Sequence, residues 1–179
     1  MLEKDIQEIL FSEEQLAQRV KEIAGEINRD YVGQEIMLVS VLRGSFVFMA
    51  DLCRRIDLPC TVDFMAVSSY GGGTSSSGQV QITKDLSGDI SGKHILVVED
   101  ILDSGNTLSY LLHVLSARHP ASISLCTLLD KPSAGRSPSR PTMWLHRPQR
   151  LHRGLRPGLR GEIPQPAYIG VLKPEIYSN

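Results

Sequence analysis

Residues 95–108 read Ile-Leu-Val-Val-Glu-Asp-Ile-Leu-Asp-Ser-Gly-Asn-Thr-Leu, and this stretch decides the fold class. It opens with four apolar residues, as expected of a strand that is buried on both faces of a parallel sheet. Glu99 and Asp100 follow directly, and Asp103 then leads into a turn of small residues. Apolar residues recur with helical spacing from Leu108 onwards. The stretch therefore predicts a strand, a loop and a helix at the carboxyl edge of an α/β sheet, where such folds bind ligands.

The turn at residues 103–107 has the composition of a phosphate-binding loop. It offers hydroxyl groups, a glycine and backbone N–H groups, and the next helix points its N-terminus at it. Carboxylates at the end of the preceding strand suit ribose hydroxyls or a hydrated Mg²⁺ ion. For the turn considered alone, the alternative to a ligand site is an ordinary N-capped helix after a strand, with the acids exposed at the loop. The full order of strand, paired acids, turn and helix favours a ligand site.

The rest of the pattern alternates strands with helices, which predicts a doubly wound parallel sheet. Ser12-Glu13-Glu14-Gln15 is a capping box at the start of a helix that extends to about Asn28. The Gly- and Ser-rich stretch around residues 70–79 predicts a flexible loop. Further strands are expected at residues 5–11, 36–42, 61–67, 80–84 and 123–129, and further helices at residues 45–55 and 107–117.

Composition fits one globular domain over residues 1–179, with 41% hydrophobic residues. The formal net charge of −1 gives no indication of nucleic-acid binding by the whole chain. No apolar run approaches the roughly 18 residues of a membrane span, so no membrane association is expected. Cys53, Cys60 and Cys126 lack a C-x-x-C spacing, and we expect them to be reduced, as in the cytoplasm.

Residues 97–108 closely resemble the signature of the purine and pyrimidine phosphoribosyltransferases, which bind phosphoribosyl pyrophosphate. Residues 41–45 (Val-Leu-Arg-Gly-Ser) are similar to the pyrophosphate-binding loop of that family, and residues 68–71 (Ser-Ser-Tyr-Gly) to the start of its mobile lid. Residues 128–131 (Leu-Leu-Asp-Lys) resemble the end of its base-recognition strand. Together the segments resemble the bacterial hypoxanthine-guanine branch of the family, up to about residue 133 and again from Tyr168 to Pro174.

The resemblance implies a phosphoribosyltransferase type I fold. Such a fold has a twisted, mainly parallel sheet flanked by helices, a small hood and a flexible lid loop, here at about residues 69–80. The resemblance also implies Mg²⁺-dependent transfer of 5-phosphoribosyl to hypoxanthine or guanine, which yields IMP or GMP and pyrophosphate in purine salvage. Homodimers or homotetramers are expected on the same basis.

The resemblance assigns Asp103 as the general acid and base that acts at purine N7. Glu99 and Asp100 would contact the ribose hydroxyls, with Mg²⁺ nearby. The complete set that would bind ribose and the 5-phosphate is Glu99, Asp100, Asp103, Ser104, Gly105, Asn106 and Thr107.

Pyrophosphate would bind to Leu42, Arg43 and Gly44, where the family often has a cis peptide bond. Ser69 and Tyr70 would begin the lid, whose closure keeps water from an oxocarbenium-like transition state. Lys131 would donate a hydrogen bond to the purine 6-oxo group. Because a lysine only donates, it favours 6-oxopurines over adenine.

Residues 132–167 depart from the family pattern. They hold seven Arg, no Lys, one acid and seven of the ten Pro, so their formal charge is +6 and the rest of the chain carries −7. Prolines at this spacing prevent long helices and strands. In the family this region carries the aromatic residue that stacks on the base, an Asp near Mg²⁺ and an Arg for pyrophosphate.

Residues 144–166 can be back-translated so that a neighbouring reading frame encodes GFTVPNAFIVGYGLDYAGRYRNLP, which is nearly the whole missing motif. We therefore interpret the segment as an out-of-frame reading, caused by a sequencing error or by compensating insertions and deletions. Two alternatives stay open. One is a catalytically impaired protein with this fold, and the other is a regulator whose Arg-rich arm binds RNA.

Overall fold

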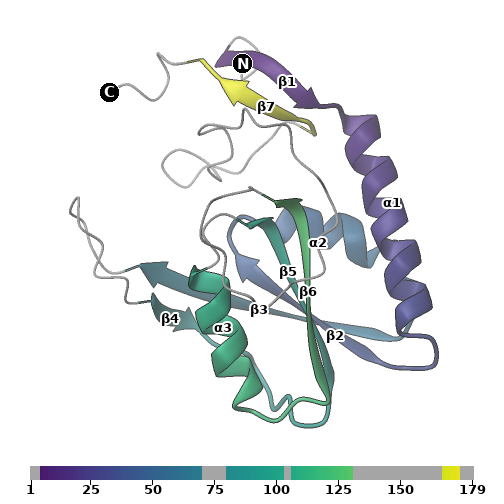
Figure 1. The fold of residues 1–179 in the computed structure, drawn as a ribbon, viewed down its shortest axis with the longest axis vertical. Coiled ribbons are helices and arrows are strands. Elements are labelled where there is room, and N and C mark those ends of the chain that lie inside the picture. Colours follow the sequence, from purple (N-terminus) through teal and green to yellow (C-terminus); the bar gives the residue numbers. More distant parts are fainter. Residues whose placement is uncertain (1–4, 70–79, 103–105, 131–166, 174–179) are drawn as a thin grey trace.

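Strands and helices largely alternate along the chain, as the apolar pattern predicts (Figure 1). The computed structural model describes residues 5–69, 80–102, 106–130 and 167–173. The elements in chain order are β1 (Ile6–Phe11), α1 (Glu13–Asp30), β2 (Ile36–Leu42), α2 (Phe46–Cys53), β3 (Cys60–Ser69), β4 (Val80–Lys84), β5 (His94–Leu102), α3 (Asn106–Ser116), β6 (Ser122–Asp130) and β7 (Ile169–Leu172).

The main sheet has the strand order β4-β3-β2-β5-β6. Strands β3, β2, β5 and β6 are parallel, and β4 returns antiparallel to β3. The register pairs Ser40 of β2 with Val98 of β5, and Glu99 of β5 with Thr127 of β6. The carboxyl ends of β2 and β5 therefore lie side by side. This architecture confirms the predicted mainly parallel sheet with flanking helices.

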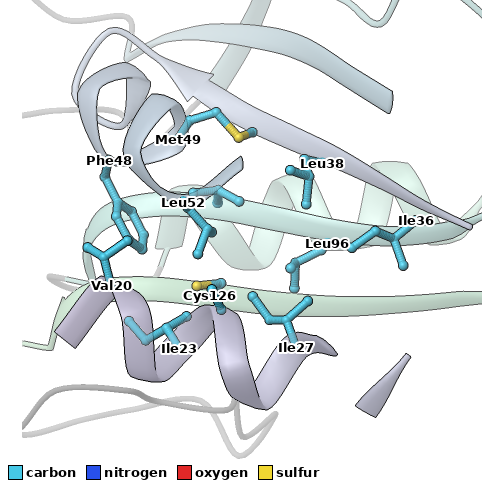
Figure 2. Packing of buried hydrophobic residues seen from close by; sticks show 12 residues of the cluster. Val20, Ile23, Ile27, Ile36, Leu38, Phe48, Met49, Leu52, Leu96 and Cys126 are labelled. Atoms are coloured by element: carbon cyan, nitrogen blue, oxygen red, sulfur yellow. The ribbon is translucent and has the colours of Figure 1, made fainter. Parts of the chain in front are cut away.

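Both faces of the main sheet are covered, because its central strands carry apolar side chains on each face. On one face Leu96 of β5 packs with Ile23 of α1 and Leu52 of α2 (Figure 2). On the other face Val97 packs with Leu111 of α3. Fully burying one such side chain stabilises the fold by roughly 1.5–3 kcal/mol. The two apolar clusters therefore hold α1 and α2 on one face of the sheet and α3 on the other.

Helix α1 begins at the predicted capping box. The Ser12 hydroxyl oxygen accepts a hydrogen bond from the Gln15 backbone N–H at 3.3 Å, and Gln15 Oε1 accepts one from the Ser12 backbone N–H at 2.8 Å. Ile23 and Ile27 lie four residues apart on the buried face of the helix, as an amphipathic helix requires. The helix ends at Asp30, close to the predicted end.

Strands β1 and β7 form a separate two-stranded antiparallel sheet. The pairing joins Ile9 to Gly170, and it brings segments from the two ends of the chain together (Figure 1). Packing is close, because a Cβ atom on Gly170 would lie 3.0 Å from the Glu8 backbone oxygen. The strand expected at residues 5–11 is confirmed, whereas its partner did not follow from the sequence.

Two strands are longer than predicted. β5 continues to Leu102, so Glu99 and Asp100 lie within the strand and not after its end. β3 continues to Ser69, which pairs with Val80 of β4. Because sheet hydrogen bonding extends past the last apolar residue, polar residues at a strand end are easily read as loop.

The three cysteines are free thiols, as expected. Cys126 is buried, and Cys53 and Cys60 are partly exposed. Burial raises the pKa of the Cys126 thiol to about 12. A helix long and apolar enough to cross a membrane is not found among the described residues.

Candidate active site

The predicted site lies at the carboxyl edge of the main sheet, where β2 and β5 end beside each other. α2 is the next element after β2 along the chain, and α3 is the next element after β5 (Figure 1). The N-termini of two helices therefore follow this edge of the sheet. Helix N-termini favour anions, which suits the phosphorylated ligand that the sequence predicts.

Glu99 and Asp100 form a largely buried pair of acids in β5. Burial raises the pKa of the Glu99 carboxyl well above its usual range, and both the charge of Asp100 and a hydrogen bond with it add to the rise. Burial also raises the pKa of Asp100, although backbone N–H groups and the hydrogen bond with Glu99 partly oppose this. A bound cation, or hydroxyl groups that donate hydrogen bonds, would therefore stabilise the charged forms of both carboxyls.

The acid pair has the ligand chemistry of a site for a hard cation. Among the residues that the structure describes, the buried Oε2 of Glu99 has no hydrogen-bond partner, and neither does the buried hydroxyl of Thr127, which is opposite Glu99 on β6. Within the described ranges, no group of three or more His, Cys, Asp or Glu side chains is placed to hold a metal by itself. The chemistry of the two carboxylates fits Mg²⁺, but such an ion would need further oxygen ligands from elsewhere.

The loop after β2 packs directly against Asp100. A Cβ atom added to Gly44 would lie 2.8 Å from Asp100 Cγ, 2.9 Å from Oδ1 and still closer to Oδ2. Non-bonded carbon atoms normally lie about 3.5–4.0 Å apart, so a larger residue cannot fit here without displacement. The contact brings the predicted pyrophosphate loop and the predicted ribose-binding acids into one site.

The loop itself is held by serines at its two ends. The peptide bond between Leu42 and Arg43 is cis, as the resemblance implied, and the Arg43 side chain is exposed. Ser45 Oγ donates a hydrogen bond to the Val41 backbone oxygen at 2.6 Å and lies 2.7 Å from Ser40 Oγ. The sequence analysis includes Ser45 in the loop segment without a role of its own, and it does not identify Ser40. The available signal is that Ser40 interrupts the otherwise apolar β2.

The hairpin of β3 and β4, which flanks the predicted lid loop, has a fixed base. The buried Asp63 carboxylate accepts hydrogen bonds from the backbone N–H groups of Ser87 at 2.6 Å and Phe64 at 2.7 Å, and from Lys84 Nζ at 3.4 Å. Burial by itself raises the pKa of this carboxyl, but the hydrogen bonds and the lysine charge outweigh it and lower the pKa overall.

The remaining predicted site residues are described only in part. Ser69 ends β3, Asn106 begins α3, and Thr107 lies exposed in the first turn of α3. Tyr70, Asp103, Ser104, Gly105, Lys131 and most of the Arg- and Pro-rich segment lie outside the described residues.

The phosphoribosyl transferase domain model matches residues 7–145, which is more than half of the chain. The chain belongs to the phosphoribosyltransferase family. The hypoxanthine-guanine phosphoribosyltransferase of Streptococcus thermophilus is 42% identical over 181 residues, and the match covers 100% of both chains. The bifunctional protein TilS/HprT of Listeria innocua is 43% identical over 180 residues. That match covers 99% of this chain, which spans 28% of the length of the bifunctional relative.

Solved structures agree with this membership. A hypoxanthine phosphoribosyltransferase from Staphylococcus aureus is 37% identical and has a TM-score of 0.88, covering 99% of this chain and 98% of that one. The predicted phosphoribosyltransferase fold is thereby confirmed, as is the predicted resemblance to the hypoxanthine-guanine branch of the family.

Proposed function

We propose that this phosphoribosyltransferase transfers 5-phosphoribosyl from phosphoribosyl pyrophosphate to N9 of hypoxanthine or guanine. The bond from C1′ to pyrophosphate breaks as the C1′–N9 bond forms, and the products are IMP or GMP and pyrophosphate. The observation that carries the proposal is the contact of Gly44 with Asp100, which joins the loop after β2 to the acids of β5. Relatives named for hypoxanthine and guanine support the choice of purine.

In this proposal Glu99 and Asp100 accept hydrogen bonds from the ribose hydroxyls. Their raised pKa values support the assignment, because ribose donors compensate the charge that burial disfavours. The same carboxylates would hold Mg²⁺, which supplies charge neutralisation for the diphosphate leaving group. The backbone N–H groups of residues 42–44 would bind pyrophosphate.

The other roles come from the family resemblance. Asp103 takes the proton from purine N7 as the glycosidic bond forms. Ser104, Gly105, Asn106 and Thr107 cradle the 5-phosphate at the N-terminus of α3. Lys131 donates to the purine 6-oxo group, and Ser69 and Tyr70 begin the lid.

The test is an assay of the purified chain with phosphoribosyl pyrophosphate, Mg²⁺ and each purine, with products separated by chromatography. We expect IMP from hypoxanthine, GMP from guanine, and no product from adenine. Asp103→Asn should lower kcat by about 10²–10⁴-fold, which is the usual size of a general acid–base contribution. Turnover of adenine at the rate of hypoxanthine would contradict the assignment of a 6-oxopurine.

The segment at residues 132–167 favours a second candidate, which is an impaired enzyme or an RNA-binding regulator. The segment is strongly basic, and the family match ends within it at residue 145. Resequencing the DNA that encodes residues 130–170 separates the candidates. A shifted frame would restore the family's purine-binding motif, whereas the sequence as written predicts binding of phosphoribosyl pyrophosphate with little turnover. Retention of RNA at physiological salt would favour the regulator.

We also propose a homodimer or homotetramer in the cytoplasm. The location is supported by three free cysteines, which suit a reducing compartment. Sedimentation of the purified chain would give the assembly, and a monomer at micromolar concentration would contradict it.

A further inference from the structure

Two buried serines enclose the loop at residues 42–44. Ser40 lies in β2 and Ser45 directly precedes α2, and both are 0% exposed. Ser45 Oγ donates to the Val41 backbone oxygen at 2.6 Å and lies 2.7 Å from Ser40 Oγ. We call this arrangement the Ser40–Ser45 bridge.

The direction of the bridge follows from the number of hydrogens. A serine hydroxyl has one proton to donate. Because the Ser45 proton goes to the Val41 carbonyl, Ser40 must be the donor in the bond between the hydroxyls. The bridge is therefore a directed chain from Ser40 through Ser45 to Val41, with Ser45 as its central member.

Ser45 does not cap α2 in the usual way. An N-cap serine normally has an extended backbone, and its side chain accepts a hydrogen bond from the first turn of the helix. Ser45 has φ −81° and ψ −4°, and its side chain makes no capping hydrogen bond. The hydroxyl is directed back across the loop, so its contribution is to the loop and not to the helix.

The loop is thus constrained at two places. The Ser40–Ser45 bridge joins its ends inside the core, and Gly44 packs against Asp100 at the sheet edge. We propose that the bridge is a positioning device that aligns the loop N–H groups with pyrophosphate. This inference rests on the proposed pyrophosphate-binding function of the loop. Both serines are fully buried, so they act through the loop and do not touch the substrate.

The chain of donors predicts unequal effects of two substitutions. Ser45→Ala removes both hydrogen bonds of the bridge, whereas Ser40→Ala removes only the one between the two hydroxyls and leaves the bond from Ser45 to Val41 intact. We expect Ser45→Ala to raise the Kd for Mg-pyrophosphate and the KM for phosphoribosyl pyrophosphate about tenfold. That factor corresponds to about 1.4 kcal/mol, the scale of one buried hydrogen bond. Ser40→Ala should raise both by only about twofold to threefold.

Substrate selectivity separates positioning from a general loss of structure. The KM for hypoxanthine should stay within about twofold of the wild-type value in both variants, because each substitution removes only hydrogen bonds of the Ser40–Ser45 bridge, which acts on the pyrophosphate loop. Ser45→Thr keeps a hydroxyl and should recover most of the pyrophosphate affinity. If Ser45→Ala does not fold, Ser40→Ala and Ser45→Thr still test the inference.

Ser124→Ala is the matched control. Ser124 Oγ accepts a hydrogen bond from the Tyr31 hydroxyl at 2.8 Å, and its strand position pairs with Leu96, away from the carboxyl edge. This variant should lower the unfolding midpoint and leave pyrophosphate binding unchanged.

Calorimetry with Mg-pyrophosphate gives three distinguishable outcomes. A tenfold loss confined to pyrophosphate and phosphoribosyl pyrophosphate supports the bridge as a positioning device. Affinity within twofold of wild type for Ser45→Ala, or equal losses for pyrophosphate and hypoxanthine, overturns the inference and leaves the proposed function standing. If the wild-type chain does not bind Mg-pyrophosphate at all, the proposed function of the loop fails first and the inference fails with it.

Discussion

Replacing Gly44 with alanine tests whether the loop after β2 and the acids of β5 form one site. Gly44 does not have a positive φ, so alanine meets no backbone conflict there. The added Cβ atom would lie 2.8 Å from Asp100 Cγ, which is about 0.7 Å inside normal carbon–carbon contact. All of the close atoms belong to the Asp100 carboxyl group, so either this side chain must rotate away from its place in the acid pair or the loop must shift.

The magnitude follows from the cost of overpacking a close contact, which is typically about 1–3 kcal/mol. If the shift acts on the transition state, this range corresponds to a fall in kcat/KM of about 5-fold to 150-fold. Steady-state kinetics with phosphoribosyl pyrophosphate measure the fall, and urea unfolding shows how much of the cost appears as lost stability.

Gly88→Ala is the matched control, because Gly88 also lacks a positive φ and nothing lies within 4 Å of its Cβ position. It should leave both kcat/KM and stability nearly unchanged. A double-mutant cycle of Gly44→Ala with Asp100→Ala isolates the contact between the two residues. The stability cost of Gly44→Ala should shrink when the Asp100 carboxyl is absent. Wild-type kinetics for Gly44→Ala, or an unchanged cost in the Asp100→Ala background, would refute the reasoning.

Three further predictions concern side chains outside the loop. The pKa of Asp63 is lowered in the folded state, so its contribution to stability is complete above the unfolded pKa of about 3.9 and is lost as the pH falls through the folded value. Asp63→Asn should therefore be less stable in urea at pH 7 by about 1.5–3 kcal/mol, and the difference from wild type should narrow at pH 3. Thr127→Val should raise the unfolding free energy by up to about 1 kcal/mol, because it removes a buried hydroxyl that has no partner among the described residues, and a measured loss of stability would indicate a hydrogen bond to another part of the chain. Cys126, with its thiol pKa raised to about 12, should resist a thiol reagent at pH 8 until the protein is unfolded, whereas Cys53 should react in the folded protein.

The parts of the fold that the sequence predicts are those with strong local patterns. The apolar stretch at residues 36–42 and the one that starts at Ile95 are both observed as central parallel strands. The capping box at Ser12 is observed with both of its hydrogen bonds. Such features depend on residues only a few positions apart, so they can be read without knowledge of the rest of the chain.

The pairing of β1 with β7 shows that local patterns do not predict which strands become neighbours. Ile9 and Gly170 lie opposite each other, yet nothing near either residue indicates the other. The alternation of a short strand specifies which side chains share a face, but not which strand is its neighbour. The extension of β5 through Glu99 and Asp100 does not follow from the local sequence either, because the hydrogen bonds that continue the strand come from its partner β6.

The sequence by itself determined the fold class, the family and the short segments that carry the candidate chemistry, because each depends on neighbouring residues. Only the tertiary structure decided that Gly44 meets Asp100, that Ser40 reaches Ser45 across the loop, and that the pKa values of the acids in β5 are raised. The physical reason is that contact, burial and desolvation depend on which strands lie side by side. That arrangement is set by the packing of the whole sheet between its helices.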